Sequence, residues 1–437
     1  MIEIEKKLSD RAVALKPSGI RRFFDIANEM DGVISLGVGE PDFKTPYSVR
    51  RAGIENLQSG KTGYSANAGL IELRRAICRY LERKFSLSYD PKKEVIVTVG
   101  GSEAIDLAIR AFLNPGDEVL IPAPYWLSYP DMVELAGGVP VTVHAGPERN
   151  FKVTPLMLEE KTTDKTRLLV LNSPSNPTGA VYSDREFMQI MRWALARNIF
   201  VLSDEIYDQL VFPPAKMTSA ITWFEHCPEL VAVLNGLSKS YAMTGWRVGF
   251  LAAHPDLVKK ISSMQGHSTS SICSVSQKAA LAALEGPVEC VDEMRAAFLR
   301  RRDLALAIIK AWPWAVCPKP DGAFYLFVDV HQCYGDQVRN STELCTYLLD
   351  KAHVALVPGA AFGDDNCIRL SYAVADDVLA DALSTALFVM GLDRGVQFWQ
   401  TWRDHDDVRF ECIFITDDGS VYLTQGLTDR FALTQDH

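Results

Sequence analysis

Short apolar runs alternate with longer amphipathic stretches through the middle of the chain. The apolar runs are 95–99, 118–121, 167–171, 200–202, 231–234 and 248–252. The apolar residues of 102–113 and of 184–197 have helical spacing, and each of these stretches lies between two consecutive apolar runs. Strands that are apolar on both faces are typical of a parallel sheet covered by helices. We therefore predict an α/β fold with a mainly parallel sheet and helices on both of its faces.

The chain changes character after residue 287. A long helix rich in arginine, alanine and leucine is predicted over 288–312, followed by a strand, a helix and two strands over 323–330, 342–352, 354–357 and 368–372. This pattern predicts a smaller α+β domain. We place the large domain at 46–287, and the discontinuous small domain at 1–45 and 288–391.

The last stretch, 392–437, is acidic and β-like. Its apolar runs at 412–415 and 421–424 flank Asp418-Gly419, a dipeptide that favours a tight hairpin turn. We therefore expect a β-rich tail with a hairpin.

Composition narrows the classes of function. The net charge of −10 argues against a general surface for nucleic acid or anionic membrane. Nine scattered cysteines without a CxxC pair indicate reduced thiols, with no disulfide framework or zinc site. No signal peptide and no run of eighteen apolar residues is visible, so a cytoplasmic location is expected by elimination.

Lys239 is the residue that most suggests chemistry. It follows the run 231–234 in a Gly/Ser loop, Arg247 lies eight residues further on, and Asp204 ends another run. A lysine amine can form a Schiff base with an aldehyde, an acid can hold a pyridine nitrogen, and a cation can bind a phosphate. Asn176 also follows a predicted strand, and ligands of such sheets bind at the carboxyl ends of the strands. We therefore predict a pyridoxal 5′-phosphate (PLP) site.

Seven motifs occur in an order that points to one family. They are GVGEPDF at 37–43, GGSEA at 100–104, PYW at 124–126, NPTG at 176–179, SDEIY at 203–207, the lysine string at 238–247 and IRLS at 368–371. With them, residues from about 15 to 372 resemble a fold-type I, class I PLP-dependent aminotransferase. The resemblance implies the two-domain fold-type I architecture. It also implies transfer of an amino group from an L-amino acid to a 2-oxo acid, by a ping-pong Schiff-base mechanism.

The resemblance also implies roles for residues around the cofactor ring. Lys239 would form the Schiff base and later move the Cα proton, and Asp204 would keep the pyridine nitrogen protonated. Tyr207 and Asn176 would bond the phenolate oxygen of the ring, and Trp126 would stack on its face.

The phosphate and the substrate have their own implied contacts. The helix that opens with Gly101, Ser102 and Glu103 would bind the phosphate together with Arg247. Tyr64 would reach the phosphate of a neighbouring subunit, so a homodimer is expected. The implied substrate contacts are Gly39, Trp126, Asn176 and Arg369, with Arg369 pairing with the α-carboxylate.

Two departures from the family pattern affect these expectations. Many members have a serine where this chain has Gly236, and members of the aspartate branch often have a substrate-binding lysine where this chain has Ser102. The strings at 124–140 and 268–285 resemble the prokaryotic aspartate branch, whereas 16–21 and 100–104 resemble aromatic or broad-specificity archaeal relatives. The amino donor therefore stays open between aspartate and aromatic amino acids, and the resemblance implies 2-oxoglutarate as the acceptor.

The C-terminus resembles a second family. Residues 380–391 and 414–430 are similar to the C-terminal end of FAD:protein FMN transferases, in which positions matching Asp381 and Thr385 lie near magnesium. The flavin-binding part of that family has no counterpart here, so no flavin transfer is expected. No metal site is assigned, and whether Asp381 and Thr385 bind a metal stays open on the sequence. The alternative is that 377–390 is simply the terminal helix of the small domain.

Other functions remain open on the sequence. A PLP-dependent C–S β-lyase would use the same Lys239 and Asp204. A PLP-sensing regulator would need a DNA-binding module, and no helix-turn-helix precedes the domain. A mosaic chain that does not hold the cofactor is the last alternative.

Overall fold

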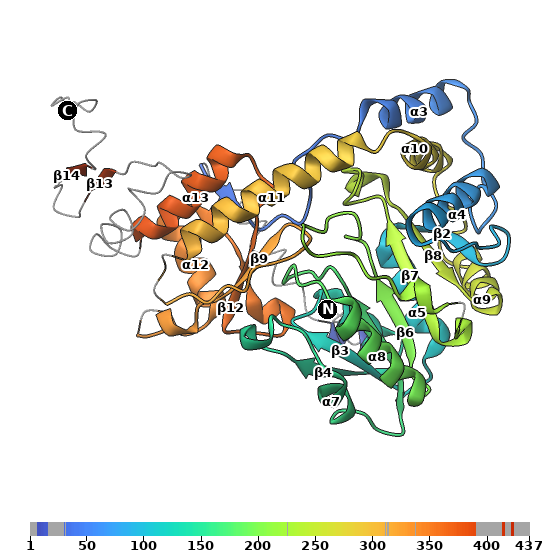
Figure 1. Ribbon diagram of the computed structural model, residues 1–437, viewed down its shortest axis with the longest axis horizontal. Helices are drawn as coiled ribbons and strands as arrows, with labels where there is room; N and C mark the ends of the chain where they lie inside the picture. The colour runs from blue at the N-terminus through green and yellow to red at the C-terminus, as the bar shows by residue number, and fades with distance from the viewer. Residues whose placement is uncertain are drawn as a thin grey trace.

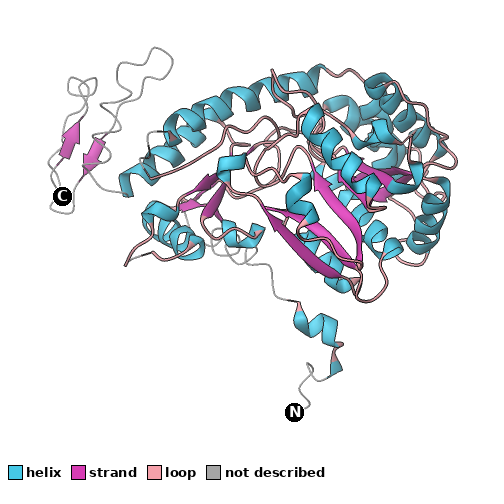
Figure 2. Ribbon diagram, turned by 60° about the horizontal axis from the view of Figure 1, so that its bottom comes forward, coloured by secondary structure: helices cyan, strands magenta, loops and turns pink. Residues whose placement is uncertain are grey.

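The computed structural model describes residues 7–15, 30, 32–224, 226–310, 312, 314–336, 338–389, 413–415 and 421–423 (Figure 1). A seven-stranded sheet lies among helices, and a smaller region with its own sheet lies beside it (Figure 2). The strand order of the large sheet is β2-β8-β7-β6-β5-β3-β4. The strands are β2 (Val95–Val99), β3 (Glu118–Ala123), β4 (Val139–His144), β5 (Thr166–Asn172), β6 (Phe200–Asp204), β7 (Val231–Gly236) and β8 (Val248–Ala253).

Parallel pairing dominates this sheet, as predicted. The pairs β7–β6, β6–β5, β5–β3 and β3–β4 are parallel, and β8 is antiparallel to both β2 and β7. A parallel strand would need a long crossover after β7. The segment 237–247 offers only the short 3₁₀ turn η5 (Thr244–Trp246), so the chain turns back beside β7.

Alternate residues of the strands face opposite sides of the sheet. Val97 packs in a core with helices α3 (Tyr47–Gln58), α4 (Ile71–Phe85), α8 (Asp184–Ala196) and α10 (Ser274–Glu285). Ile96 packs on the other face with α5 (Gly100–Phe112), α6 (Ser128–Leu135) and α9 (Pro255–Gly266). Both faces are buried, which explains the near-continuous apolar runs in the sequence.

The second region is built around the antiparallel sheet β11-β12-β9 and is called here the small-sheet region. Its strands are β9 (Tyr325–Asp329), β11 (Val357–Pro358) and β12 (Cys367–Ser371), and its helices are α11 (Glu289–Ile309), α12 (Ser341–Ala352) and α13 (Asp376–Val389). Helix α11 extends from this region toward α3 and α10 (Figure 1). Leu379, Ala382 and Leu383 of α13 are buried in the core of the region.

Several predicted strand boundaries differ from the structure, and two of the differences have a clear reason. The strand predicted over 354–357 is two strands in different sheets, because β10 (Val354–Ala355) pairs with β1 (Ile34–Ser35) and β11 pairs with β12. The strand predicted to stop before Pro122 continues to Ala123, because its pairing with β4 runs on to His144. Two short helices, α1 (Asp10–Ala14) and α7 (Pro155–Glu159), complete the described helices.

Part of the tail is described. Strands β13 (Ile413–Ile415) and β14 (Val421–Leu423) pair in antiparallel fashion, which confirms the two hairpin strands. The predicted turn at Asp418-Gly419, the rest of 392–437, and the string 16–21 lie outside the described residues. No helix in the described ranges is both long enough and apolar enough to cross a membrane.

Candidate active site

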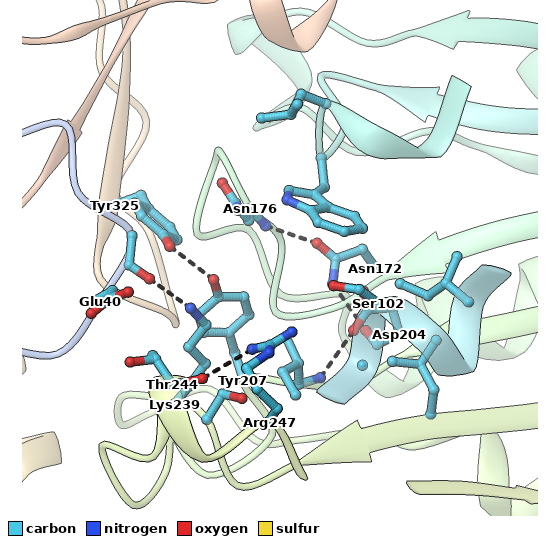
Figure 3. Close-up of a pocket in the computed structure, with 18 of the residues that line it drawn as sticks. Glu40, Ser102, Asn172, Asn176, Asp204, Tyr207, Lys239, Thr244, Arg247 and Tyr325 are labelled. Atoms are coloured by element: carbon cyan, nitrogen blue, oxygen red, sulfur yellow. Dashed lines mark hydrogen bonds between the residues drawn. The ribbon is translucent and has the colours of Figure 1, made fainter. Parts of the chain in front are cut away.

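A cavity of about 550 Å³ opens where strands β5, β6 and β7 end and helix α5 begins (Figure 3). The small-sheet region and the loop after β1 close its other side. Ten of the residues predicted from the sequence line this cavity: Gly39, Gly101, Ser102, Trp126, Asn176, Asp204, Tyr207, Lys239, Arg247 and Arg369. Two do not, namely Glu103 and Tyr64.

Lys239 presents its amine inside the cavity. Its Nζ donates a hydrogen bond of 2.6 Å to the carbonyl of Gly39 and lies 5.8 Å from the centre of the Tyr207 ring. Burial lowers the pKa of Lys239 to about 8, against a smaller opposing effect of the Glu40 carboxylate. An amine with a lowered pKa is neutral in part near neutral pH, which is the form that attacks a carbonyl or accepts a proton.

Asp204 ends strand β6 and is only 5% exposed. Its Oδ2 accepts a hydrogen bond of 2.6 Å from the Tyr129 hydroxyl, and its Oδ1 accepts one of 3.1 Å from the backbone N–H of Ile206. Burial raises the pKa of Asp204 to about 6, and these two hydrogen bonds oppose the rise. The carboxylate is therefore oriented by neighbours and would gain from a positive partner in the cavity.

Arg369 comes from β12, across the cavity from Asp204. Its Nη1 donates to Asn176 Oδ1 at 2.9 Å, and its Nη2 donates to the carbonyl of Gly37 at 2.6 Å. Its Nε is buried without a hydrogen-bond partner, and the Tyr325 ring lies 4.6 Å from the guanidinium carbon. A buried guanidinium with a spare donor is suited to an incoming carboxylate.

The hydroxyls of Tyr207 and Tyr325 hydrogen-bond each other at 2.8 Å. Tyr325 also explains the glycine at position 39, because a Cβ there would lie 2.8 Å from its hydroxyl oxygen. The two tyrosines join the β6 side of the cavity to the β9 side.

One end of the cavity is suited to an anion. The first turn of α5 begins at Gly100, whose φ of +70° favours glycine, and a Cβ there would lie 2.7 Å from Arg247 Nη2. The guanidinium of Arg247 therefore packs against the helix start, where Nη1 donates to the Thr244 carbonyl at 3.0 Å. Helix N-termini carry free N–H groups and a positive potential, so this end would bind a phosphate.

Glu103 lies beside this end but faces elsewhere. Its carboxylate accepts hydrogen bonds from the backbone N–H of Val99 at 2.5 Å and from Gln265 Nε2 at 3.2 Å, and it also bonds the Thr269 hydroxyl. The side chain thus caps the start of α5, because a carboxylate in the first turn satisfies free N–H groups. Only the backbone of Glu103 remains in the helix turn that faces the anion end.

The glycine at position 236 has a packing reason. A Cβ there would lie 2.9 Å from Ile206 Cδ1 and 3.0 Å from the Val248 carbonyl oxygen. The serine found here in many relatives of the resembled family would need the β7–β8 pair to shift.

Tyr64 lies in the loop between α3 and α4 and is 95% exposed. It does not reach the cavity of its own chain. Tyr47, Ile54 and Leu57 of α3 are exposed as well.

Asp381 and Thr385 both lie on α13, one helical turn apart. Within the described part of the chain, no group of three His, Cys, Asp or Glu side chains is arranged to hold a metal ion.

Several residues of the cavity were not singled out from the sequence. They are Glu40, Asn172, Thr244 and Tyr325. Tyr129, which does not line the cavity but donates a hydrogen bond to Asp204, was not singled out either. Asn172 could have been found, because it is the polar residue that ends β5; its Nδ2 donates to the Asp204 carbonyl at 3.0 Å and its Oδ1 accepts from the Asn176 N–H at 2.8 Å. Tyr129 and Tyr325 carry no local signal, because their partners are distant in the sequence.

The residues fit PLP. The cavity combines an amine on Lys239, a buried carboxylate on Asp204 and an anion end at Arg247, which are the three groups that this cofactor requires. Arg369 adds a third cation to the cavity lining, and its Nε has no hydrogen-bond partner among the described residues.

Comparison with known proteins gives consistent matches. The family model for aminotransferase class I and II matches residues 31–387. An aspartate/prephenate aminotransferase of Cereibacter sphaeroides is 42% identical over 386 residues, covering 86% of this chain and 96% of that protein. An aspartate aminotransferase of Bacillus sp. YM-2 is 40% identical over 385 residues, covering 87% of this chain and 98% of that protein. The crystal structure of an aspartate aminotransferase from Rhizobium meliloti matches with a TM-score of 0.83 at 36% identity, covering 87% of this chain and 97% of that one.

Proposed function

The chain belongs to the class I and II aminotransferase family and is an aminotransferase, and on this premise we propose that PLP is its cofactor and that it moves the amino group of aspartate or an aromatic amino acid to 2-oxoglutarate. The observation that carries this proposal is the convergence of Lys239, Asp204, Arg247 and Arg369 on one cavity. The same convergence argues against a chain that does not hold the cofactor. The relatives are aminotransferases, which does not favour the β-lyase alternative.

The cofactor would be held by groups from both the sheet and its helices. Arg247 and the first turn of α5, with Gly101 and Ser102, would hold the phosphate, and Asp204 would accept a hydrogen bond from the ring nitrogen. Tyr207 would bond the ring oxygen, and Trp126 would pack against the ring. Bound there, PLP supplies an electron sink for the negative charge that develops at the Cα of the amino acid.

The chain's own groups would bind and orient the substrate. Arg369 has one spare donor at Nε, and its other bonds go to a backbone carbonyl and an amide oxygen, which an α-carboxylate can replace. A charged acceptor forms stronger hydrogen bonds than either of these neutral ones. Gly39, without a side chain, lets the substrate approach Lys239, whose amine would then remove and return the Cα proton.

The substrate side chain meets a mixed surface. The cations that line the described cavity are Lys239, Arg247 and Arg369, and each already has a role in this account. Ser102 stands where a lysine would favour an acidic side chain, and Ile105, Trp126 and Leu127 add apolar area. These features support an aromatic donor in addition to aspartate, and the Cereibacter sphaeroides relative is named for both aspartate and prephenate.

A donor screen tests this proposal. Purified protein supplied with PLP should show the absorbance of bound cofactor and should form glutamate from 2-oxoglutarate with aspartate, phenylalanine or tyrosine. A Lys239→Ala variant is the control for background reaction. Release of pyruvate and ammonia from a cysteine conjugate, without glutamate formation, would contradict the proposal and would favour the β-lyase.

We also propose that the active form is a homodimer in which Tyr64 contacts the phosphate site of the neighbouring subunit. The full exposure of Tyr64 and the exposed apolar residues on α3 support this arrangement. Light scattering should report twice the mass of the chain, and Tyr64→Phe should weaken PLP binding. A fully active monomer would contradict it.

The domain division at 46–287 and at 1–45 with 288–391 remains a proposal that the separate apolar cores support. We propose that the helix over 377–390 is the terminal helix of the small domain and that Asp381 and Thr385 bind no metal. The likeness of the tail to FAD:protein FMN transferases carries no activity of its own here. The cytoplasmic location stays a prediction.

A further inference from the structure

The loop over residues 37–43, called here the carbonyl loop, touches both cations that act on the substrate. The Gly39 carbonyl accepts a hydrogen bond of 2.6 Å from Lys239 Nζ, and the Gly37 carbonyl accepts one of 2.6 Å from Arg369 Nη2. The position of this loop therefore sets the direction of both side chains. Figure 3 shows the loop passing the cavity at Glu40, beside Lys239.

The two ends of the loop are tied to different parts of the fold. Before it, the Leu36 N–H donates to the carbonyl of Ala355 in β10 at 2.9 Å. After it, the Thr45 hydroxyl donates to the Ala242 carbonyl at 2.6 Å and accepts from Trp246 Nε1 at 3.1 Å, in the segment that carries Lys239. The loop thus crosses from β10 to the segment between β7 and β8, and a further contact supports it between these ends.

Arg301 of α11 supplies that support. Its Nη1 and Nη2 donate to the two carboxylate oxygens of Asp42 at 2.8 and 2.9 Å, and its Nε donates to Asp376 Oδ1 at 2.9 Å. The guanidinium carbon also lies 5.5 Å from the centre of the Phe43 ring, which packs edge-on against Phe298. A bidentate pair of this kind fixes geometry as well as contributing energy.

Burial makes this contact more than a surface ion pair. Arg301 is only 6% exposed, whereas its sequence neighbour Arg300 is exposed. Arg300 donates to the same Asp376 at 2.7 and 3.1 Å, and no described hydrogen bond joins Arg300 to Asp42. The two arginines therefore share one acceptor, and Arg301 adds the link to the carbonyl loop.

We propose that Arg301 is a positioning residue for the aminotransferase reaction. Through Asp42 it holds the carbonyl loop so that Gly37 orients Arg369 for the α-carboxylate and Gly39 orients Lys239 for the Cα proton. This inference rests on the proposed function of Lys239 and Arg369. It adds a residue outside the cavity, on α11, whose removal weakens substrate binding without touching substrate or cofactor.

Arg301→Met tests the proposal, with Arg300→Met as its matched control. Both variants lose one charge and one partner of Asp376, and only the first frees Asp42. We expect Arg301→Met to raise the KM for the amino donor about tenfold, the effect of losing about 1.4 kcal/mol of binding. Its kcat should change less than its KM, and Arg300→Met should leave both near the wild-type values.

Hydrogen exchange gives a second readout, on protein without cofactor or substrate. The amides of residues 37–43 should exchange faster in Arg301→Met than in Arg300→Met, whereas those of β6 should not differ. Asp42→Asn should reproduce the KM effect, and the double variant with Arg301→Met should add little, because both remove the same contact. If Arg301→Met fails to fold, Asp42→Asn carries the test, since Asp42 is partly exposed.

The outcomes distinguish a failure of the positioning role of Arg301 from a failure of the proposed aminotransferase function. Equal KM values and equal loop exchange in the two arginine variants would overturn the positioning role. A change in thermal stability alone would do the same, because a merely structural ion pair lowers stability and leaves KM unchanged. If the wild-type protein does not transaminate, the proposed function fails, while the exchange comparison still decides whether Arg301 holds the loop.

Discussion

The two walls of the cavity hold their polar groups in different ways. On the wall made by strand ends, Asp204 is fixed by a tyrosine hydroxyl and a backbone N–H. On the wall made by the carbonyl loop and β12, Arg369 bonds a carbonyl and an amide oxygen and keeps a buried Nε without a partner. The first wall suits a resident cofactor, and the second suits a substrate that arrives and leaves.

This difference leads to different expected effects. A change on the strand-end wall should reduce the rate of the chemical step, because Asp204, the proposed charge partner of the cofactor ring, would act as the reaction proceeds. A change on the loop wall should first reduce substrate binding. Kinetics that measure kcat and KM separately therefore test whether the two walls differ in this way.

The largest effect is expected at Asp204. Asp204→Ala should lower kcat by about a hundredfold to a thousandfold, because a preorganised charge is lost from a buried site. Tyr129→Phe keeps the carboxylate and removes one hydrogen bond, so it should cost only about tenfold. Steady-state kinetics with saturating PLP measure both, and an Asp204→Ala variant with unchanged kcat would contradict the assignment of this wall.

Arg369→Lys should act mainly on substrate affinity. A lysine keeps the charge and loses the planar fork, so kcat/KM for the amino donor should fall by about tenfold to a hundredfold. The loss should lie mostly in KM, and PLP absorbance should remain. A loss confined to kcat would place Arg369 in the chemical step and would remove the distinction between the two walls.

Much of this arrangement could be predicted from the sequence, for physical reasons. Strands buried on both faces leave a clear apolar pattern, and polar residues such as Asp204 and Lys239 at their ends must meet at one edge of the sheet. The antiparallel direction of β8 leaves no trace in composition, although the short connection before it is a hint. The apolar run over 354–357 could not show that its two halves are strands of different sheets.

The loop wall was harder to predict. Tyr325 and the Asp42–Arg301 pair act through partners that lie far away in the sequence, 259 residues apart for the pair. Glu103 was expected at the phosphate because of its place in a motif. That expectation concerns the N–H groups of the first turn of α5 and stays a prediction, while the side chain of Glu103 caps the helix, which the motif does not show. The role of Tyr64 depends on a second subunit and stays a prediction.

The lysine itself should carry a stability cost in the cofactor-free protein. Burial lowers the pKa of Lys239 to about 8, below its usual value of 10.5. The unfolded chain therefore binds more protons between these pH values, so stability rises with pH in this window. Lys239→Met should raise the free energy of unfolding by about 2–3 kcal/mol at pH 7.

That gain should shrink to about half at pH 9.5, because the charged form is then lost from the folded protein. Urea unfolding of both proteins at the two pH values measures the difference. A gain that does not depend on pH would show that packing of the methionine, and not the buried charge, is responsible.

The smallest effect is expected from the tail. A chain that ends at Leu392 should retain PLP binding and transamination, because every proposed site residue lies at or before Arg369. Removing 377–390 as well should destabilise the protein, since Leu379 and Leu383 are buried and each contributes about 1.5–3 kcal/mol. Loss of cofactor absorbance in a folded 1–392 chain would place the tail in the active site.

The central claim is that Lys239 is the residue that binds the cofactor covalently, and borohydride reduction tests it most directly. Protein loaded with PLP is reduced, digested and mapped by mass spectrometry. The account predicts a pyridoxyl group on the peptide that contains Lys239, and its absence from that peptide when the protein is first treated with excess amino donor. A pyridoxyl group on a different lysine would contradict the account.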